Sequence, residues 1–119
     1  MSIKQGDIWL VNFDPSIETE IQKKRPCIVI NDDKVGRFGI KIIVPITEWK
    51  DYFSDFPWII KLENTSQNGL SKKSAIECFQ IKSFSEERFI NKIGIVSSET
   101  INDIHQKVLK TLNPLYKIS

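Results

Sequence analysis

The sequence carries a run of β-branched and aromatic residues close to its start, Ile8-Trp9-Leu10-Val11-Asn12-Phe13. Residues of these types favour a pleated, half-buried strand over a helix. Gly6-Asp7 precedes the run and Asp14-Pro15-Ser16 follows it, and both groups are typical of strand ends. This stretch therefore predicts a first strand over residues 8–13.

Five later stretches have a similar composition and predict strands at 27–31, 40–46, 58–62, 75–79 and 92–97. Pro26 is expected to open the second of the six strands, since proline is tolerated at the first residue of a strand. Polar loops are expected over 14–24 and 32–39, and Asn68-Gly69 is a turn signal. Ser83 and Glu86 have capping-box spacing, which predicts a short helical turn over 83–89.

The hydrophobic period changes at Ser98, after which Ile101, Ile104, Val108, Leu109 and Leu112 follow helical spacing. Ser98 is the expected N-cap, and Pro114 is expected to stop the helix. The fold class is therefore mainly β: a small barrel-like sheet with one C-terminal α-helix packed on it.

The composition indicates one globular domain spanning residues 1–119. Apolar residues make up 40% of the chain and charged residues 27%, and the net charge is only +2. No apolar run approaches the ~18–20 residues of a membrane span. The N-terminus also lacks the pattern of a signal peptide, so we expect a cytoplasmic protein with no membrane partner.

The cysteines and the histidine offer little chemistry. Cys27 and Cys78 each lie in an apolar run and are expected to be buried, unpaired thiols. His105 is the only histidine and falls in the helical segment, where a surface or half-buried position is expected. No metal-ligand spacing, phosphate-binding loop or dinucleotide fingerprint is present, so we expect no metal site and no cofactor.

Arg25 is the first candidate for chemistry, since it ends the basic run Lys23-Lys24-Arg25 at the junction of a polar loop and a strand. Between residues 21 and 41, six cations and two aspartates give a local charge of +4. A guanidinium group matches phosphate oxygens with two parallel hydrogen bonds. Thr47, at the end of the third strand, offers a hydroxyl donor to the same kind of oxygen.

Two further groups are weaker candidates. Glu18-Thr19-Glu20 brings carboxylates to the 14–24 loop, where one near an arginine would accept a proton. Five aromatic residues gather within ten positions. We expect several of these to be core residues, and one or two to be exposed for stacking on RNA bases. They are Trp49, Tyr52, Phe53, Phe56 and Trp58.

These motifs, in this order, resemble the MazF/PemK toxin family. The resemblance rests on the run from Gly6 to Val11, Lys24-Arg25-Pro26, Val44-Pro45-Ile46-Thr47, and the later Gly69-Leu70-Ser71-Lys72 and Gln80-Ile81. It covers nearly the whole chain, from about residue 3 to residue 116.

The resemblance implies an SH3-like barrel, a homodimer, and a metal-independent endoribonuclease that cuts single-stranded RNA and is blocked by a cognate antitoxin protein. By position, Arg25 and Thr47 would be the catalytic pair, and Glu20 the loop carboxylate. Gln80 would lie near the RNA groove, beside Lys82. Lys23, Lys24 and Trp49 complete the expected RNA contacts.

The sequence departs from the family at two positions. The loop usually reads Gly-Ser-Glu where this chain has Glu18-Thr19-Glu20, and Lys82 replaces an arginine that often follows Gln-Ile. Two alternatives therefore stay open: a CcdB-like, non-enzymatic poison of DNA gyrase, and an RNA-binding module without catalysis.

Overall fold

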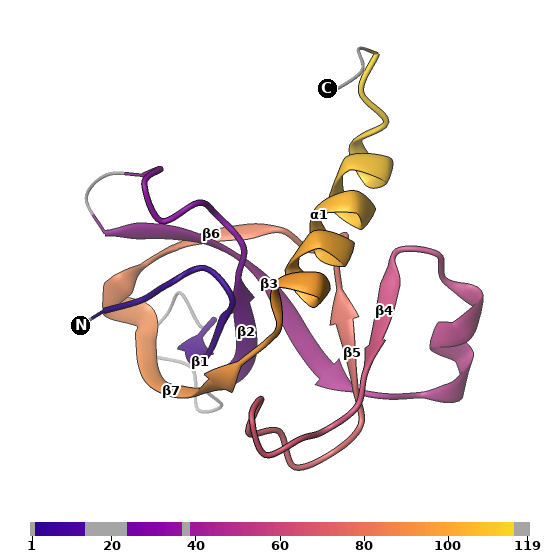
Figure 1. Cartoon of the computed structure of the whole chain (residues 1–119), viewed down its shortest axis with the longest axis horizontal. Helices are drawn as coiled ribbons and strands as arrows, with labels where there is room; N and C mark the ends of the chain where they lie inside the picture. Colours follow the sequence, from indigo (N-terminus) through magenta and orange to yellow (C-terminus); the bar gives the residue numbers. More distant parts are fainter. Residues whose placement is uncertain (1, 14–23, 37–38, 116–119) are drawn as a thin grey trace.

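The computed structural model describes residues 2–13, 24–36 and 39–115 (Figure 1). Glu20 and Lys23 therefore lie outside the described residues. The elements in chain order are β1 (Asp7–Asn12), β2 (Lys24–Val29), β3 (Ile40–Glu48), the 3-10 helix η1 (Asp51–Asp55), β4 (Ile59–Leu62), β5 (Ser74–Glu77), β6 (Lys82–Ser85), the 3-10 helix η2 (Glu86–Arg88), β7 (Phe89–Ile95) and α1 (Ser98–Leu112). All six predicted strands and the helix are present.

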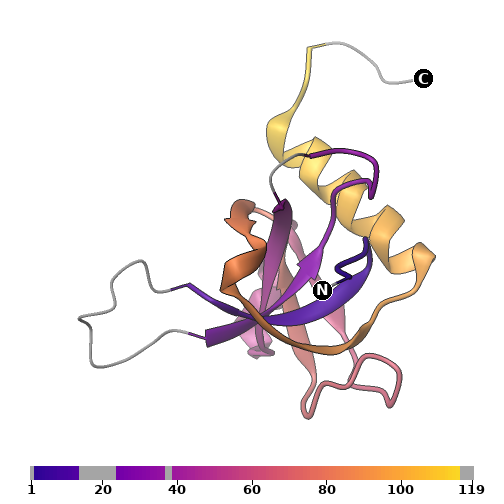
Figure 2. The same ribbon diagram turned by 90° about the vertical axis from the view of Figure 1, so that its left-hand side faces the viewer.

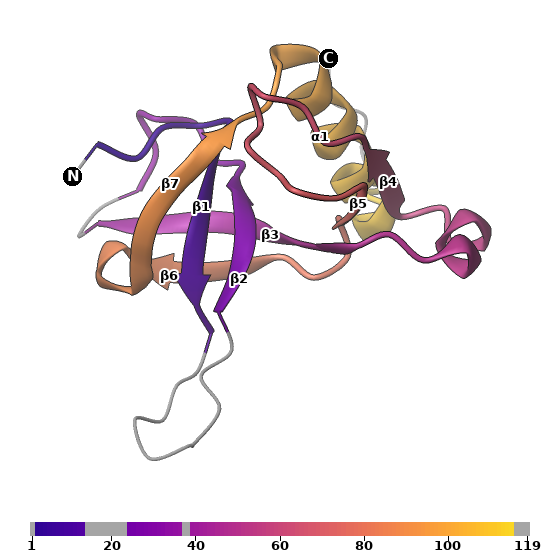
Figure 3. The ribbon, with the colours of Figure 1, turned by 90° about the horizontal axis from the view of Figure 1, so that it is seen from below.

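β3 is the central strand of an antiparallel sheet with the order β4-β5-β3-β2-β1-β7. Its first half pairs with β6, its middle with β2 and its last three residues with β5. Among the described residues the sheet curls without closing, so the predicted small SH3-like β-barrel fits as a barrel-like description (Figure 3). The β4–β5 hairpin forms one end of the molecule.

The two faces of the sheet bury different sets of side chains because alternate residues of a strand point to opposite sides. Ile8, Ile28 and Val44 pair across β1, β2 and β3 and pack with Ile101 and Ile104 of α1. Figure 2 shows α1 lying across this side of the sheet.

The other face holds a second cluster that includes Trp9, Cys27, Val29 and Ile43. Phe89 of β7 packs edge-to-face on Trp9, with their ring centroids 6.0 Å apart. The sheet is thus buried on both sides over β1, β2 and the middle of β3.

Helix α1 has its N-cap one residue before the predicted one, and it stops before Pro114 as predicted. Ser97, rather than Ser98, is the N-cap, and its Oγ accepts a 3.1 Å hydrogen bond from the backbone N–H of Thr100. Asn113 adopts a left-handed conformation at the C-terminal end, with φ 48°, directly before Pro114. Asparagine tolerates that conformation better than most residues.

Two local predictions were wrong because strand pairing overrides local propensity. The 83–89 segment begins as β6, which lies against the first half of β3, and only Glu86–Arg88 is helical. Its cap is Ser85 rather than Ser83. Pro26 does not open β2, since that strand already begins at Lys24.

Candidate functional site

Arg25 and Thr47 lie where β2 and β3 separate. Pairing between the two strands starts at Cys27↔Pro45, and each candidate stands two residues outside that pair. Arg25 is held instead by pairing to Val11 of β1, and Thr47 by pairing to Ala75 of β5. Because residues two apart on a strand point the same way, both side chains are on the face away from α1.

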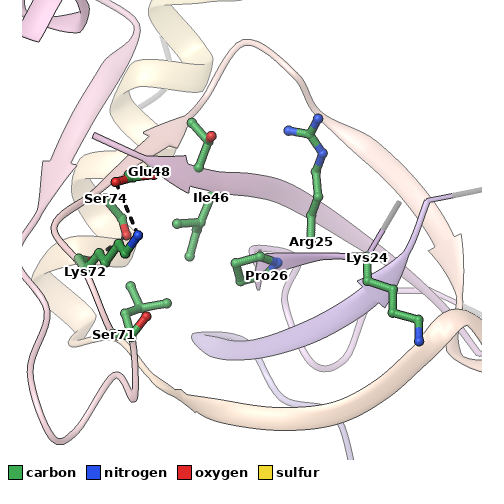
Figure 4. Close-up of a pocket in the computed structure, with 10 residues that line it drawn as sticks. Lys24, Arg25, Pro26, Ile46, Glu48, Ser71, Lys72 and Ser74 are labelled. Atoms are coloured by element: carbon green, nitrogen blue, oxygen red, sulfur yellow. Dashed lines mark hydrogen bonds and ion pairs between the residues drawn. The ribbon is translucent and has the colours of Figure 1, made fainter. Parts of the chain in front are cut away.

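A cavity of about 510 Å³ opens between these separating strand ends (Figure 4). Arg25 and Lys24 point to opposite sides of β2, and Pro26 and Ile46 lie away from the guanidinium group. The loop between β4 and β5 closes the remaining side. The lining residues are Lys24, Arg25, Pro26, Ile46, Thr47, Glu48, Leu70, Ser71, Lys72 and Ser74.

Glu48, at the edge of the cavity, lies between two lysines. Its carboxylate lies 3.6 Å from Nζ of Lys72 and 3.9 Å from Nζ of Lys50, and all three side chains are more than half exposed. The side chain of Arg25 makes no hydrogen bond or ion pair with another described residue. The half-buried guanidinium group can therefore offer both of its donor edges to an anion.

The loop that carries Ser71 and Lys72 is fixed by the side chain of Asn68. Asn68 is 3% exposed, accepts hydrogen bonds from the backbone N–H groups of Thr65 and Leu70, and donates to the carbonyl of Glu63. The predicted Asn68-Gly69 turn is confirmed, with φ 69° at Gly69. The wall of the cavity opposite Arg25 is thus a well-anchored turn.

The two cysteines are buried, unpaired thiols, as expected. Burial raises the pKa of Cys27, and the positive charge of Arg25 only partly opposes that rise. Burial also raises the pKa of Cys78 to about 12, against a smaller lowering by Lys107. Both thiols stay protonated at neutral pH, so neither is a nucleophile.

His105 is half-buried on α1, as predicted, with Nε2 2.8 Å from the carbonyl oxygen of Ile30. This contact joins the helix to the end of β2. Within the ranges that the structure describes, no three His, Cys, Asp or Glu side chains gather in a way that would hold a metal ion.

The remaining expected RNA contacts lie outside the cavity. Trp49 follows Glu48 at the end of β3, and Lys82 pairs with Ile43 at the start of β6. Gln80 is exposed, and its amide donates a 3.0 Å hydrogen bond to the carboxylate of Glu77. The structure therefore brings together Lys24, Arg25 and Thr47 but not these three residues.

Two charged lining residues were missed as candidates, although the sequence carried a signal for each. Glu48 directly follows Thr47, and Lys72 opens the Lys72-Lys73 pair before β5. The expectation that several aromatic residues between 49 and 58 are core was wrong. Tyr52 and Trp58 are exposed and the other three are half-buried.

Comparison with known proteins gives the family. Residues 4–112 match the family model described as PemK-like, MazF-like toxin of type II toxin-antitoxin system. The chain belongs to this family. Among the described residues, the single α-helix is too short and too polar to cross a membrane.

Curated MazF relatives are similar along most of their length. Endoribonuclease MazF9 of Mycobacterium tuberculosis is 28% identical over 111 residues, which cover 87% of this chain and 91% of the relative. Endoribonuclease EndoA of Bacillus subtilis is 24% identical over 106 residues, covering 89% of this chain and 90% of the relative.

Solved MazF-like structures share the fold. MazF from Deinococcus radiodurans superposes with a TM-score of 0.74 at 16% identity, covering 96% of this chain and 99% of that one. A mycobacterial endoribonuclease in complex with its cognate antitoxin gives a TM-score of 0.72 at 12% identity, covering 98% of this chain and 100% of that one.

Proposed function

We propose that this MazF-like toxin is an endoribonuclease that cuts single-stranded RNA at short sequences. One observation carries the proposal: Arg25 and Thr47 face the same side where β2 and β3 separate, beside an open cavity. The curated relatives MazF9 and EndoA are endoribonucleases, which supports the same activity. The chain acts as one toxin domain over residues 1–119.

The reaction we propose uses the RNA as its own nucleophile. The 2′-oxygen of one nucleotide attacks the adjacent phosphorus, and the bond from phosphorus to the 5′-oxygen of the next nucleotide breaks. The products are a 2′,3′-cyclic phosphate and a 5′-hydroxyl end. The proton of the 2′-hydroxyl passes to a base, and the leaving 5′-oxygen gains a proton. This chemistry needs neither a metal ion nor a protein nucleophile.

Arg25 is assigned to the charge that builds on the phosphate oxygens during attack. Such stabilisation by a preorganised donor is worth ~3–4 kcal/mol where it has been removed in other enzymes. β1 holds the backbone of Arg25, and its guanidinium group stays unpaired among the described residues, so the group is available to a phosphate oxygen. Thr47 donates its hydroxyl to one of the same oxygens.

Glu20 is assigned the proton from the 2′-hydroxyl, because an arginine with a pKa above ~12 is a poor base at neutral pH. Arg25 can instead donate the proton to the leaving oxygen. Lys23 and Lys24 attract the RNA backbone. Trp49, Gln80 and Lys82 are assigned to contacts with RNA nucleotides on either side of the bond that is cleaved.

The expected partners follow from the same groove. A cationic surface that accepts RNA also accepts an acidic, partly disordered antitoxin that folds on binding. One solved structural neighbour is an endoribonuclease bound to its cognate antitoxin. We propose that this chain is likewise a homodimer, neutralised by an antitoxin, and that it acts in the cytoplasm.

The test is cleavage of a mixed-sequence, single-stranded RNA by the purified protein in excess EDTA, followed by mapping of the 5′ ends. Site-restricted cuts with 5′-hydroxyl ends that disappear in Arg25→Ala are the expected result. RNA that is bound but stays intact would favour the non-catalytic module. Absence of both binding and cleavage would direct attention to gyrase supercoiling.

A further inference from the structure

Six aromatic side chains form a continuous chain of ring contacts at the β4–β5 end of the molecule. The ring centroids lie 4.8–6.2 Å apart from one pair to the next. Phe56 and Trp58 are stacked, at 5.0 Å and an interplanar angle of 6°. The members, hereafter the aromatic surface, are Trp49, Tyr52, Phe53, Phe56, Trp58 and Phe79.

Most of the aromatic surface is carried by η1 and its flanking residues, which project beyond β4 (Figures 1 and 3). Tyr52 is 60% exposed, Phe79 63% and Trp58 37%. Exposing rings of this size to water is unfavourable, and contiguous apolar patches of this kind usually mark a site of interaction.

One end of the aromatic surface, at Trp49, lies on the same face of the sheet as Thr47, since Lys61 pairs with Ala75 and lies over the Trp49 ring. Trp49 continues β3 two residues beyond Thr47, and its N–H donates to the carbonyl of Lys73 at 3.0 Å, which extends the pairing with β5. The other end turns toward α1: Phe79 lies in the turn after β5 and packs on Trp58, which lines a cavity with Lys107, Lys110 and Thr111. An RNA strand that leaves Thr47 along this face meets Trp49 first, and the other rings continue from it.

The charges around η1 are balanced. Lys50 flanks η1, and Nζ of Lys61 lies 5.2 Å from the ring centroid of Trp49. Asp51 and Asp55 at the two ends of η1 oppose them. The rings at η1 therefore suit a ligand held by its flat, uncharged parts, next to a cavity whose Lys24 and Arg25 attract its phosphates.

We infer that the aromatic surface is a stacking platform for bases of single-stranded RNA next to the nucleotide held at Arg25 and Thr47, an inference that rests on the proposed function. The phosphates bind in the cavity beside Lys24 and Arg25, and the bases stack on the rings. Stacking tolerates many base sequences because every base has a flat face. Phe79 directly precedes Gln80, so the platform also brings the RNA to that amide. The platform lengthens the RNA contact without taking part in bond cleavage.

The test compares Tyr52→Ala and Phe79→Ala with Tyr52→Phe, which keeps the ring, and with Val35→Ala, which removes an exposed side chain (57% exposed) from a different loop. The probe is a labelled, mixed-sequence 2′-O-methyl RNA that cannot cyclise and so cannot be cut. Its dissociation constant is measured by fluorescence anisotropy. Cleavage of an unmodified RNA of the same sequence is followed in parallel.

We expect each alanine variant of the platform to raise the dissociation constant about tenfold, and the KM for RNA similarly, with kcat unchanged. Tyr52→Phe and Val35→Ala should bind as the wild type does. Unchanged RNA binding in both alanine variants would overturn the inference. So would a loss confined to binding of the antitoxin protein.

The two parallel assays separate this inference from the proposed function. If the wild-type protein binds the uncleavable RNA through the rings but cuts nothing, the platform stands and the endoribonuclease proposal fails. If it cuts RNA while the platform variants bind and cut normally, the endoribonuclease proposal stands and the platform fails. Wild-type protein that binds no single strand would overturn both.

Discussion

The carboxylate of Glu48 lies 3.6 Å from Nζ of Lys72, so the end of β3 is tied by charge to the loop that closes the cavity. Glu48 also contacts Lys50 at 3.9 Å. An anion thus stands beside Thr47, in a groove where RNA phosphates would bind. An RNA backbone must compete with Glu48 for these lysines.

Replacing Glu48 by glutamine should therefore strengthen RNA binding. We expect Glu48→Gln to lower the KM for RNA about threefold at low salt, with a smaller effect at high salt, because exposed charges are screened. Lys72→Ala should raise KM by a similar factor. The steady-state rate measured at two salt concentrations checks both variants, and weaker binding by Glu48→Gln would contradict the competition.

The double hydrogen bond of Arg25 is tested by Arg25→Lys, which keeps the charge and loses the planar fork. We expect kcat to fall by about 10²-fold or more while the affinity for uncleavable RNA falls much less. Single-turnover cleavage and anisotropy give the two quantities. Near-normal cleavage by Arg25→Lys would rule out a bidentate role.

The hydroxyl of Thr47 is tested by Thr47→Val, which preserves shape but removes the donor. Loss of one hydrogen bond to a charged oxygen costs ~1.5–3 kcal/mol, so kcat should fall by about tenfold or more. Thr47→Ser, which keeps the hydroxyl, is the matched control and should retain most activity. Equal rates for the serine and valine variants would show that Thr47 only packs.

Close packing of β7 against the Asn68 turn predicts a stability effect. A Cβ built on Gly94 would overlap the carbonyl group of Asn68, which is backbone and cannot move aside cheaply. Gly94→Ala should lower the free energy of unfolding by about 2 kcal/mol, seen as a lower midpoint in urea. Asn91→Ala, at an exposed neighbour on β7, should leave the midpoint nearly unchanged.

The raised pKa of Cys78 predicts that stability falls in alkali. Above pH 9 the thiol ionises in the unfolded chain but stays protonated in the fold until about pH 12, so the folded state binds more protons there. We expect Cys78 to contribute a loss of about 1 kcal/mol between pH 8 and pH 10 in urea unfolding, to which the buried Cys27 thiol, with its raised pKa, adds. Cys78→Ala should show a shallower decline, and identical slopes would mean that Cys78 is not the cause.

Most of the fold could be predicted because dense Ile and Val runs leave little alternative to buried strands. β6 escaped prediction because Lys82–Ser85 has no apolar run, and only its pairing with β3 makes it a strand. The start of β2 at Lys24 is likewise imposed by pairing with Asn12 rather than by local composition.

The placement of Arg25 and Thr47 beside the cavity could be predicted, whereas their roles stay a prediction. Arg25 and Thr47 stand at strand ends, where a family motif is easily recognised. Glu48 and Lys72 are 24 residues apart in the sequence, and only the pairing of β3 with β5 brings their charges together. The sequence shows the group of aromatic residues, but their spacing does not predict that the rings face solvent.

The position of β3 at the centre of the sheet also determines when, during synthesis of the chain, the cavity between Arg25 and Thr47 can form. Thr47 is held by β5, which is made later, and β3 gains its other partner on the same edge only with β6. A nascent chain that has just completed β3 carries Arg25 together with its partner strand β1, but it lacks β5, which holds Thr47. The cavity between Arg25 and Thr47 is therefore completed only after β5 has been synthesised.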